Sequence, residues 1–212
     1  MINKVNKPIT YFLISFLIIF ILSFSVIFIM EKEISKSKSE DIMASETRIV
    51  TTKTQILEDA LYRIIGDLGY LNHVYSLKLS ENVDLDEIAA EWTELAKHKK
   101  IYDQIRFLDA DGMEKIRVNI SGNGSYIVPD KDLQNKASRY YFNEIKNIKK
   151  DTIWFSRVDL NEEYGKIEKP FIPTLRMGVP IYYNEVFKGV LIMNVFFENT
   201  INNLVNSPFF NI

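Results

Sequence analysis

Apolar and polar positions divide the chain into one long apolar stretch followed by amphipathic segments. Residues 9–30 contain no charged side chain and consist mostly of Ile, Leu, Phe and Val. A helix of roughly 22 residues, rising 1.5 Å per residue, spans the roughly 30 Å of hydrocarbon in a bilayer. The pattern therefore predicts a transmembrane helix at 9–30 after a short N-terminal segment at 1–8.

A cleaved signal peptide is the alternative interpretation of this apolar stretch. The stretch is longer than a typical signal-peptide core, and Glu31-Lys32-Glu33 follows it in place of a small-x-small cleavage motif, so we expect an uncleaved anchor. Lys4 and Lys7 favour a cytoplasmic N-terminus, whereas the lysines that follow the span favour the opposite orientation. Because the positive-inside rule applies to short loops, charge does not decide the orientation.

The pattern from 31 to 80 is helical, which predicts a long stalk or packing helix. Its upper part is polar, and Ile42 and Ile49 continue an apolar seam there that predicts a free stalk or a homodimer contact. Its lower part predicts packing on a domain, and Gly66 and Gly69 within it predict a bend or a close approach. Steps of three and four residues separate the apolar positions of the lower part, which are Leu57, Leu61, Ile64, Leu68, Leu71 and Tyr75.

A second helix is predicted from Asp84 to about Lys100. We expect Asp84 to cap it and Glu87 to complete a capping box, with Trp92 on the apolar face. His98 lies in a basic stretch at the C-terminal end, where a positive charge suits the helix dipole. We therefore expect a solvated histidine there and no metal ligand.

After Ile101 the pattern changes from helical to strand-like. Helical spacing returns at 138–148 and in the tail at 198–205. This order predicts an α+β fold with one antiparallel sheet and helices on one side, within a domain at 81–212. The predicted strands are 101–109, 115–120, 153–160, 174–182 and 186–197.

Composition excludes several classes of function. A net charge of −2 without a basic block gives no footprint for nucleic acid. The absence of cysteine excludes disulfides, thiol catalysis and cysteine-based zinc sites. No nucleotide-binding, metalloprotease or serine-hydrolase motif occurs, so we expect no enzymatic activity, no metal and no cofactor in this chain.

YDQIRFLDADGMEKIRVN and LQNKASRYYFNEI are the first two of several segments that, in order, resemble the Cache domain, the PAS-like sensor module of bacterial receptors. The first is similar to the hairpin that begins such domains, and the second resembles the helix that they place over the ligand cavity. Two further segments are similar to the central strands of the module: WFSRVDLNEEYGKIEKPFIPTLRMGVPIY and FKGVLIMNV. The resemblance extends from the anchor to Phe197, which is most of the chain.

This resemblance implies the membrane-distal module of a double Cache sensor outside the cytoplasmic membrane. It thus supplies the orientation: a single-pass inner-membrane protein with a cytoplasmic N-terminus at 1–8. Double Cache receptors continue into a second module, another span and an output domain such as a histidine kinase, a diguanylate cyclase or a chemotaxis transducer. This chain ends at Ile212, so we expect a fragment or a truncated product, with any catalytic output domain beyond it.

The cavity implied by the resemblance would hold a small ligand among aromatic and polar side chains. Arg139 and Tyr140 begin the helix over the sheet, where a guanidinium suits a carboxylate. Asp159 suits an ammonium group, and these residue types together favour an amino acid, an amine or an organic acid. Four further residues are predicted to line the cavity from the strands: Trp154, Ser156, Arg176 and Tyr182.

Structural interpretations of these residues compete with the ligand-binding one. Trp154 is typical of a core residue, and only one of Tyr140 and Tyr141 is expected to face inward. Arg139 has a structural alternative, an ion pair with Asp159 or Glu144.

The first predicted hairpin carries two further cations, Arg106 and Arg117. As a pair they would attract an anion, but we expect them on the solvated outer face of the sheet.

The sequence thus predicts the ligand-sensing region of a transmembrane receptor, such as a two-component sensor. Binding of a small molecule would signal through the long helix and the anchor within a homodimer. The alternative is a receptor region that reads a separate periplasmic or extracellular binding protein without its own small-molecule site.

Overall fold

The computed structural model describes residues 7–121 and 124–196, in two compact units, Met1–Thr54 and Gln55–Ile212. Helix α1 (Lys7–Glu81) contributes to both units. In the first unit the side chains of 11–30 are exposed and mostly apolar. Within the described residues α1 is the one helix long and apolar enough to cross a membrane, with a mean hydropathy of 3.0 in its 18-residue window. The limits of the span at 9 and 30 stay a prediction.

The second unit is built on an antiparallel sheet in the order β3-β2-β1-β9-β8-β4, with β5 also paired to β8. The predicted strand at 153–160 is wrong in its middle, because the sheet pairing is interrupted between β4 and β5. β3 was not predicted, and the predicted tail helix at 198–205 lies outside the described residues. The strands are β1 (Tyr102–Asp109), β2 (Glu114–Ser121), β3 (Gly124–Ile127), β4 (Trp154–Phe155), β5 (Asp159–Leu160), β8 (Pro173–Tyr183) and β9 (Val186–Phe196).

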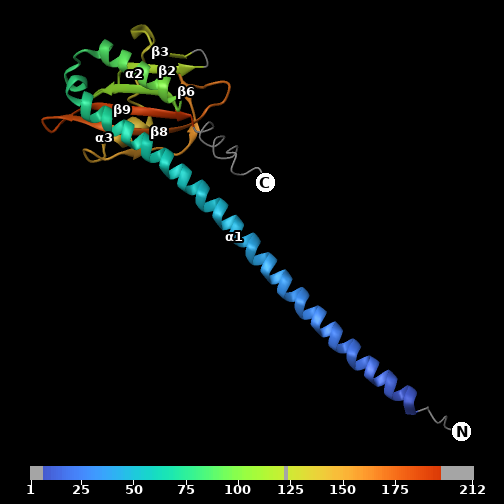
Figure 1. Cartoon of the computed structure of the whole chain (residues 1–212). Helices are drawn as coiled ribbons and strands as arrows, with labels where there is room; N and C mark the ends of the chain where they lie inside the picture. Colours follow the sequence, from blue (N-terminus) through green and yellow to red (C-terminus); the bar gives the residue numbers. More distant parts are fainter. Residues whose placement is uncertain (1–6, 122–123, 197–212) are drawn as a thin grey trace. The chain divides into compact units, whose positions relative to one another are not determined.

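Helices α1 and α2 (Leu85–Lys99) cover one face of this sheet, as Figure 1 shows for the part of α1 in the second unit. The face is apolar because alternate strand residues point toward the helices, for example Ile105 and Phe107 in β1. Leu68 of α1 and Trp92 of α2 are fully buried against them. This confirms that the lower part of the long helix packs on the domain.

The opposite face of the sheet is covered in part by α3 (Tyr140–Lys146), so the expectation of helices on one side only is wrong. Phe142 and Ile145 of α3 pack with Val190 and Ile192 of β9 in a second, smaller core cluster. The helix is short because Arg139 precedes it in an extended conformation and Asn147 ends it. The short helix therefore covers only part of this face of the sheet.

The predicted capping box of α2 is also wrong. Asp84 has a left-handed backbone with φ of 53° and makes no side-chain hydrogen bond to the helix. Its carboxylate lies 3.4 Å from Lys78 Nζ, and Glu87 lies equally close to the same lysine. The acidic residues therefore tie α2 to the end of α1. His98 is exposed near Glu94, as expected.

The two glycines of α1 do not mark a close approach. A Cβ atom added to Gly66 or Gly69 would meet no atom within 4 Å, and the helix continues through both. The contacts within the described chain therefore give no reason for glycine at these positions.

We predict opposite effects on stability from two substitutions only two residues apart in α1. Leu68→Ala leaves a cavity in the main core cluster and is expected to cost about 2–5 kcal/mol. Gly66→Ala removes backbone freedom from the unfolded chain without a clash and is expected to add up to about 1 kcal/mol. Thermal unfolding of the full chain in detergent measures both. A destabilised Gly66→Ala variant would show that this glycine faces a partner.

Candidate ligand site

A buried polar cluster occupies the part of the second sheet face that α3 leaves uncovered. The strand register places Gln104 of β1 opposite Asn194 of β9, which in turn lies opposite Arg176 of β8. Arg106 and Arg117 face each other on β1 and β2. Because side chains alternate along a strand, these polar residues come from the same strands as the apolar core but point the other way.

The expectation that Arg106 and Arg117 are solvated is wrong, since they are only 1% and 3% exposed. Both approach Glu114, with Nη1 of Arg106 at 3.4 Å and Nη1 of Arg117 at 3.1 Å from its carboxylate. Arg106 also donates a hydrogen bond to Asn194 Oδ1 at 3.1 Å. A buried charge is costly unless it is paired, so this face requires partners for its cations.

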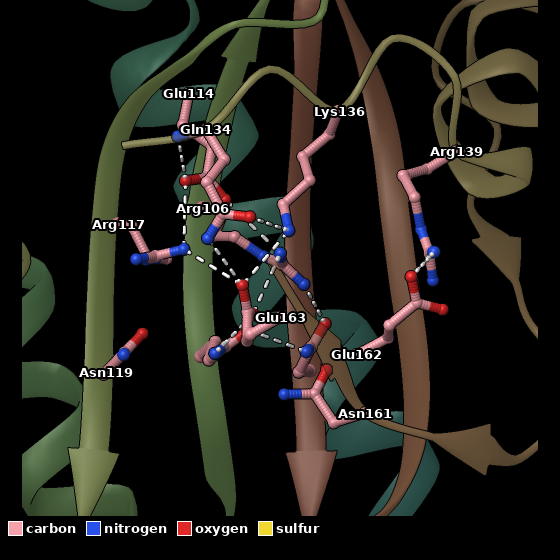
Figure 2. A network of polar contacts seen from close by, with 12 residues as sticks. Arg106, Glu114, Arg117, Asn119, Gln134, Lys136, Arg139, Asn161, Glu162 and Glu163 are labelled. Carbon is pink, nitrogen blue, oxygen red and sulfur yellow. Dashed lines mark hydrogen bonds and ion pairs between the residues drawn. The ribbon is translucent and has the colours of Figure 1, made fainter. Parts of the chain in front are cut away.

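A small hairpin supplies a second carboxylate to the cluster. β6 (Glu162–Glu163) and β7 (Lys166–Ile167) form a separate two-stranded sheet, and Tyr164 and Gly165 turn the chain with positive φ. Figure 2 shows Glu163 pointing from this hairpin into the space between Arg106, Arg117 and Lys136. These cations and Gln104 outweigh the effect of burial and lower the pKa of Glu163 to about 2.

Three of the predicted ligand-binding residues meet beside this cluster. Asp159 of β5 accepts hydrogen bonds from Arg176 and from Tyr140 Oη, the latter at 2.7 Å. Arg176 also donates to Asn161 Oδ1 at 3.1 Å, and Ser156 Oγ accepts from its backbone N–H. The carboxylate of Asp159 is thus shared between a guanidinium and a phenol.

Arg139 pairs with neither of the two expected carboxylates. It points toward Glu162 (Figure 2), and its Nη1 lies 2.7 Å from Glu162 Oε1. Asp159 pairs with Arg176 instead. Glu144 instead accepts a hydrogen bond from Trp154 Nε1 at 2.9 Å.

The predicted aromatic residues have different surroundings. Tyr141 is buried, and Tyr140 is half-buried and packs against the same core cluster, so both contact the core, contrary to expectation. Trp154 packs on Tyr140 with ring centroids 6.1 Å apart. Tyr182 packs on Phe187 and makes none of the described contacts with Asp159 or Arg176.

A surface hollow of about 540 Å³ lies next to Asp159. Arg139 and Arg157 contribute positive charge to its wall, and Asp159 and Glu162 contribute negative charge. Tyr140 supplies an aromatic surface, over which the guanidinium of Arg157 lies at 5.8 Å from the ring centroid. The hollow therefore offers both signs of charge and one ring to a small polar molecule. Its lining residues are Ser138, Arg139, Tyr140, Arg157, Asp159, Leu160, Glu162 and Ile167.

Sequence reasoning missed most of the buried polar cluster. Gln104 and Arg106 alternate with apolar neighbours, and Asn194 interrupts an apolar run, so the positions on the sheet had a visible signal. Glu163 lies in a two-residue strand and Lys136 in a loop, both without periodicity in the sequence, and nothing local indicated that they join this cluster. Asn161 is 1% exposed and contacts Arg176, which no local pattern indicated either.

Asp103 is predicted to lower the stability of the fold in a pH-dependent way. It is 6% exposed and has one carboxylate oxygen without a hydrogen-bond partner. Burial and the charges of Glu168 and Glu163 raise the pKa of Asp103 to about 6, against the opposing effect of Arg106 and Arg176. The folded protein therefore binds this proton more tightly than the unfolded chain, so stability falls as the pH rises from the unfolded pKa of about 4 through the folded pKa of about 6.

Asp103→Asn is expected to stabilise the chain by about 1–3 kcal/mol near neutral pH. The gain should shrink as the pH falls toward about 4, where the wild-type carboxyl is also neutral. Thermal unfolding of both proteins in detergent across this range measures the effect. A stability difference independent of pH would contradict it.

Comparison with known proteins identifies the second unit. The family model described as bacterial histidine kinase, sensor domain, matches residues 58–211. No curated protein matches the chain.

Solved structures with a similar fold are sensor domains. The extracellular domain of a protein described as a histidine kinase is 29% identical, with a TM-score of 0.64, covering 74% of this chain and 57% of that one. A domain of a sensory box/GGDEF family protein from Vibrio parahaemolyticus is also 29% identical, with a TM-score of 0.66 and coverages of 76% and 62%. The chain thus spans about three fifths of the length of these two structures.

The sensory domain of the Campylobacter jejuni chemoreceptor Tlp3, solved with isoleucine bound, is 11% identical with a TM-score of 0.63, covering 82% of this chain and 66% of that one. At this identity the likeness concerns the fold alone. Because the family model covers well over half of the sequence, this chain belongs to the bacterial histidine kinase sensor-domain family.

Proposed function

We propose that the chain is the extracytoplasmic ligand-sensing region of a transmembrane receptor, and that the hollow beside Asp159 binds an amino acid, an amine or an organic acid. The observation that carries this proposal is the placement of two cations and two carboxylates around one small space. A molecule with a carboxylate and an ammonium group finds a partner for each there.

Arg139 and Asp159 have complementary roles in this proposal. Arg139 would turn from Glu162 to the carboxylate of the ligand, because a guanidinium forms two parallel hydrogen bonds with such a group. Asp159 would accept the ammonium group while Arg176 and Tyr140 hold its carboxylate in place. Trp154, Ser156 and Tyr182 stay predicted ligand contacts.

The comparisons support the class of function and leave the ligand open. Membership of a sensor-domain family agrees with a ligand-sensing role, and Tlp3 sensor structures that hold isoleucine or valine share the fold. The choice of an amino acid for this chain rests on the charges of the hollow.

Signalling is proposed to pass through α1 to the membrane anchor within a homodimer. A ligand that draws loops over the sheet changes the populations of the open and closed conformations. The size of this change is set by the difference between its affinities for the two conformations. The residues of α1 from Ile64 to Leu79 belong to the core cluster on the other face of the same sheet, so a shift of the sheet would reach the helix that carries the anchor.

We predict that Arg139→Gln and Asp159→Asn each abolish ligand-induced stabilisation of the full chain in detergent. A thermal-shift screen against amino acids, organic acids and amines identifies the stabilising compound first, because a bound ligand raises the unfolding temperature. Lys150→Ala is the matched control, since it removes a cation from an exposed ion pair with Glu185. Unchanged stabilisation in both hollow variants would move the site elsewhere.

We also predict that ligand changes crosslinking between single cysteines placed at Ile42 or Ile49 in membranes. The chain has no other cysteine, so each disulfide reports one position of the helix seam. A cysteine at Met43 lies about 100° around the helix and is expected to crosslink less. Crosslinks that do not respond to a verified ligand would exclude signalling by a shift of this helix.

Recognition of a separate binding protein is the second candidate. Apolar side chains are exposed along residues 155–171, which would suit a protein surface. They are Phe155, Val158, Leu160, Tyr164, Ile167 and Phe171. A calorimetric binding isotherm with small molecules separates the two, because this candidate predicts no heat of binding in the absence of the partner.

A further inference from the structure

The carboxylate of Glu163 occupies a site that is built from other parts of the chain. Its Oε2 lies 3.2 Å from Arg117 Nη1, 2.9 Å from Gln134 Nε2 and 3.1 Å from Lys136 Nζ. Its Oε1 accepts a hydrogen bond from Gln104 Nε2 at 3.1 Å and lies 3.8 Å from Arg106 Nη1. We name these five donors the anion site: Gln104, Arg106, Arg117, Gln134 and Lys136.

The anion site has an excess of positive charge without Glu163. Two of its three cations, Arg106 and Arg117, pair with one carboxylate of the sheet framework, Glu114, whose side chain is fully buried. The side chains of Arg106, Arg117 and Lys136 are 2%, 4% and 6% exposed, so water does not solvate them freely. Buried cations of this kind require an anion, and the hairpin provides it.

The hairpin that carries Glu163 is attached mainly by polar contacts. Within the described residues neither core cluster includes a side chain of the hairpin, and Tyr164 and Ile167 are exposed. Tyr164 donates its backbone N–H to Gln134 Oε1 at 3.2 Å, and Glu162 pairs with Arg139. Few apolar contacts and many polar ones are typical of segments that open locally.

We propose that Glu163 is a tethered carboxylate in an anion-binding site, and that a small organic carboxylate competes with it and releases the β6–β7 hairpin. The rigid part of the site lies on β1, β2 and the loop before α3, whereas its occupant lies on a separate element (Figure 2). The role of this exchange in sensing rests on the proposed function. The existence of the anion site does not rest on that function.

Chemical rescue of Glu163→Ala tests the site directly. In the full chain in detergent at neutral pH, this variant is expected to unfold at a lower temperature than wild type. Sodium acetate should restore the unfolding temperature of the variant. The effect should saturate in the roughly millimolar range, since acetate has only four non-hydrogen atoms with which to bind. Sodium chloride at equal ionic strength and acetamide, the neutral isostere, should not restore it.

Glu185→Ala is the matched control, because it removes an exposed carboxylate that pairs with Lys150 and lines neither the hollow nor the anion site. Acetate binding in the hollow is common to this variant, wild type and Glu163→Ala. The anion site is open to acetate only in Glu163→Ala, because the tethered carboxylate holds it at a high effective concentration in the other two proteins. We expect acetate to bind Glu163→Ala at least about tenfold more tightly than wild type.

Equal stabilisation of all three proteins by acetate, or none in Glu163→Ala, would overturn the proposal. If Glu163→Ala does not fold in chloride, the proposal requires acetate to recover folding, and failure to do so contradicts it equally. Acetate could rescue Glu163→Ala while Arg139→Gln and Asp159→Asn leave ligand-induced stabilisation unchanged. This result would support the anion site and reject the hollow as the ligand site.

Discussion

Compensation of buried positive charge is the constraint that arranges one whole side of the second unit. Arg106, Arg117 and Arg176 project from central strands and are almost fully buried. Removing such groups from water costs several kcal/mol each unless carboxylates and amides surround them. The segments that contribute Glu163, Asp159 and other polar groups therefore lie against this part of the sheet and not in solvent.

The two faces of the sheet differ in polarity. The face toward α1 and α2 is apolar along the length of β1, β8 and β9, and it holds the larger core cluster. Because this face already buries large side chains such as Phe107 and Trp92, the opposite face does not have to be optimised for packing. It is apolar only under α3 and polar beyond it, where the hollow and the anion site lie.

The elements of the fold were more predictable from the sequence than the partners of the charged residues. The seam from Ile64 to Tyr75 and the strand alternation are local patterns, and burial follows their period. Arg106 was misplaced because one face of an antiparallel sheet is often solvated, and its coverage depends on loops more than 25 residues away in sequence. The hairpin turn at Tyr164-Gly165 had only a lone glycine as a signal.

The interruption at 156–158 illustrates the same limit. The run from 153 to 160 has strand-like composition, and a continuous strand would have paired along β8. Instead β4 and β5 each pair with β8 by two residues, and the intervening bend brings Asp159 beside Arg176 and Tyr140. The propensity of the segment was outweighed by contacts with residues distant in sequence, which local patterns do not encode.

The alternation of side chains along β6 also links the two proposed sites. Successive residues of β6 point to opposite sides, so Glu162 faces Arg139 at the hollow while Glu163 enters the anion site. A ligand that takes Arg139 away from Glu162 removes one of the polar contacts that hold the hairpin, and thereby lowers the cost of withdrawing Glu163. Conversely, an anion that displaces Glu163 frees the strand that positions Glu162. By linkage, the two events then favour each other to the same extent, whichever ligand binds first.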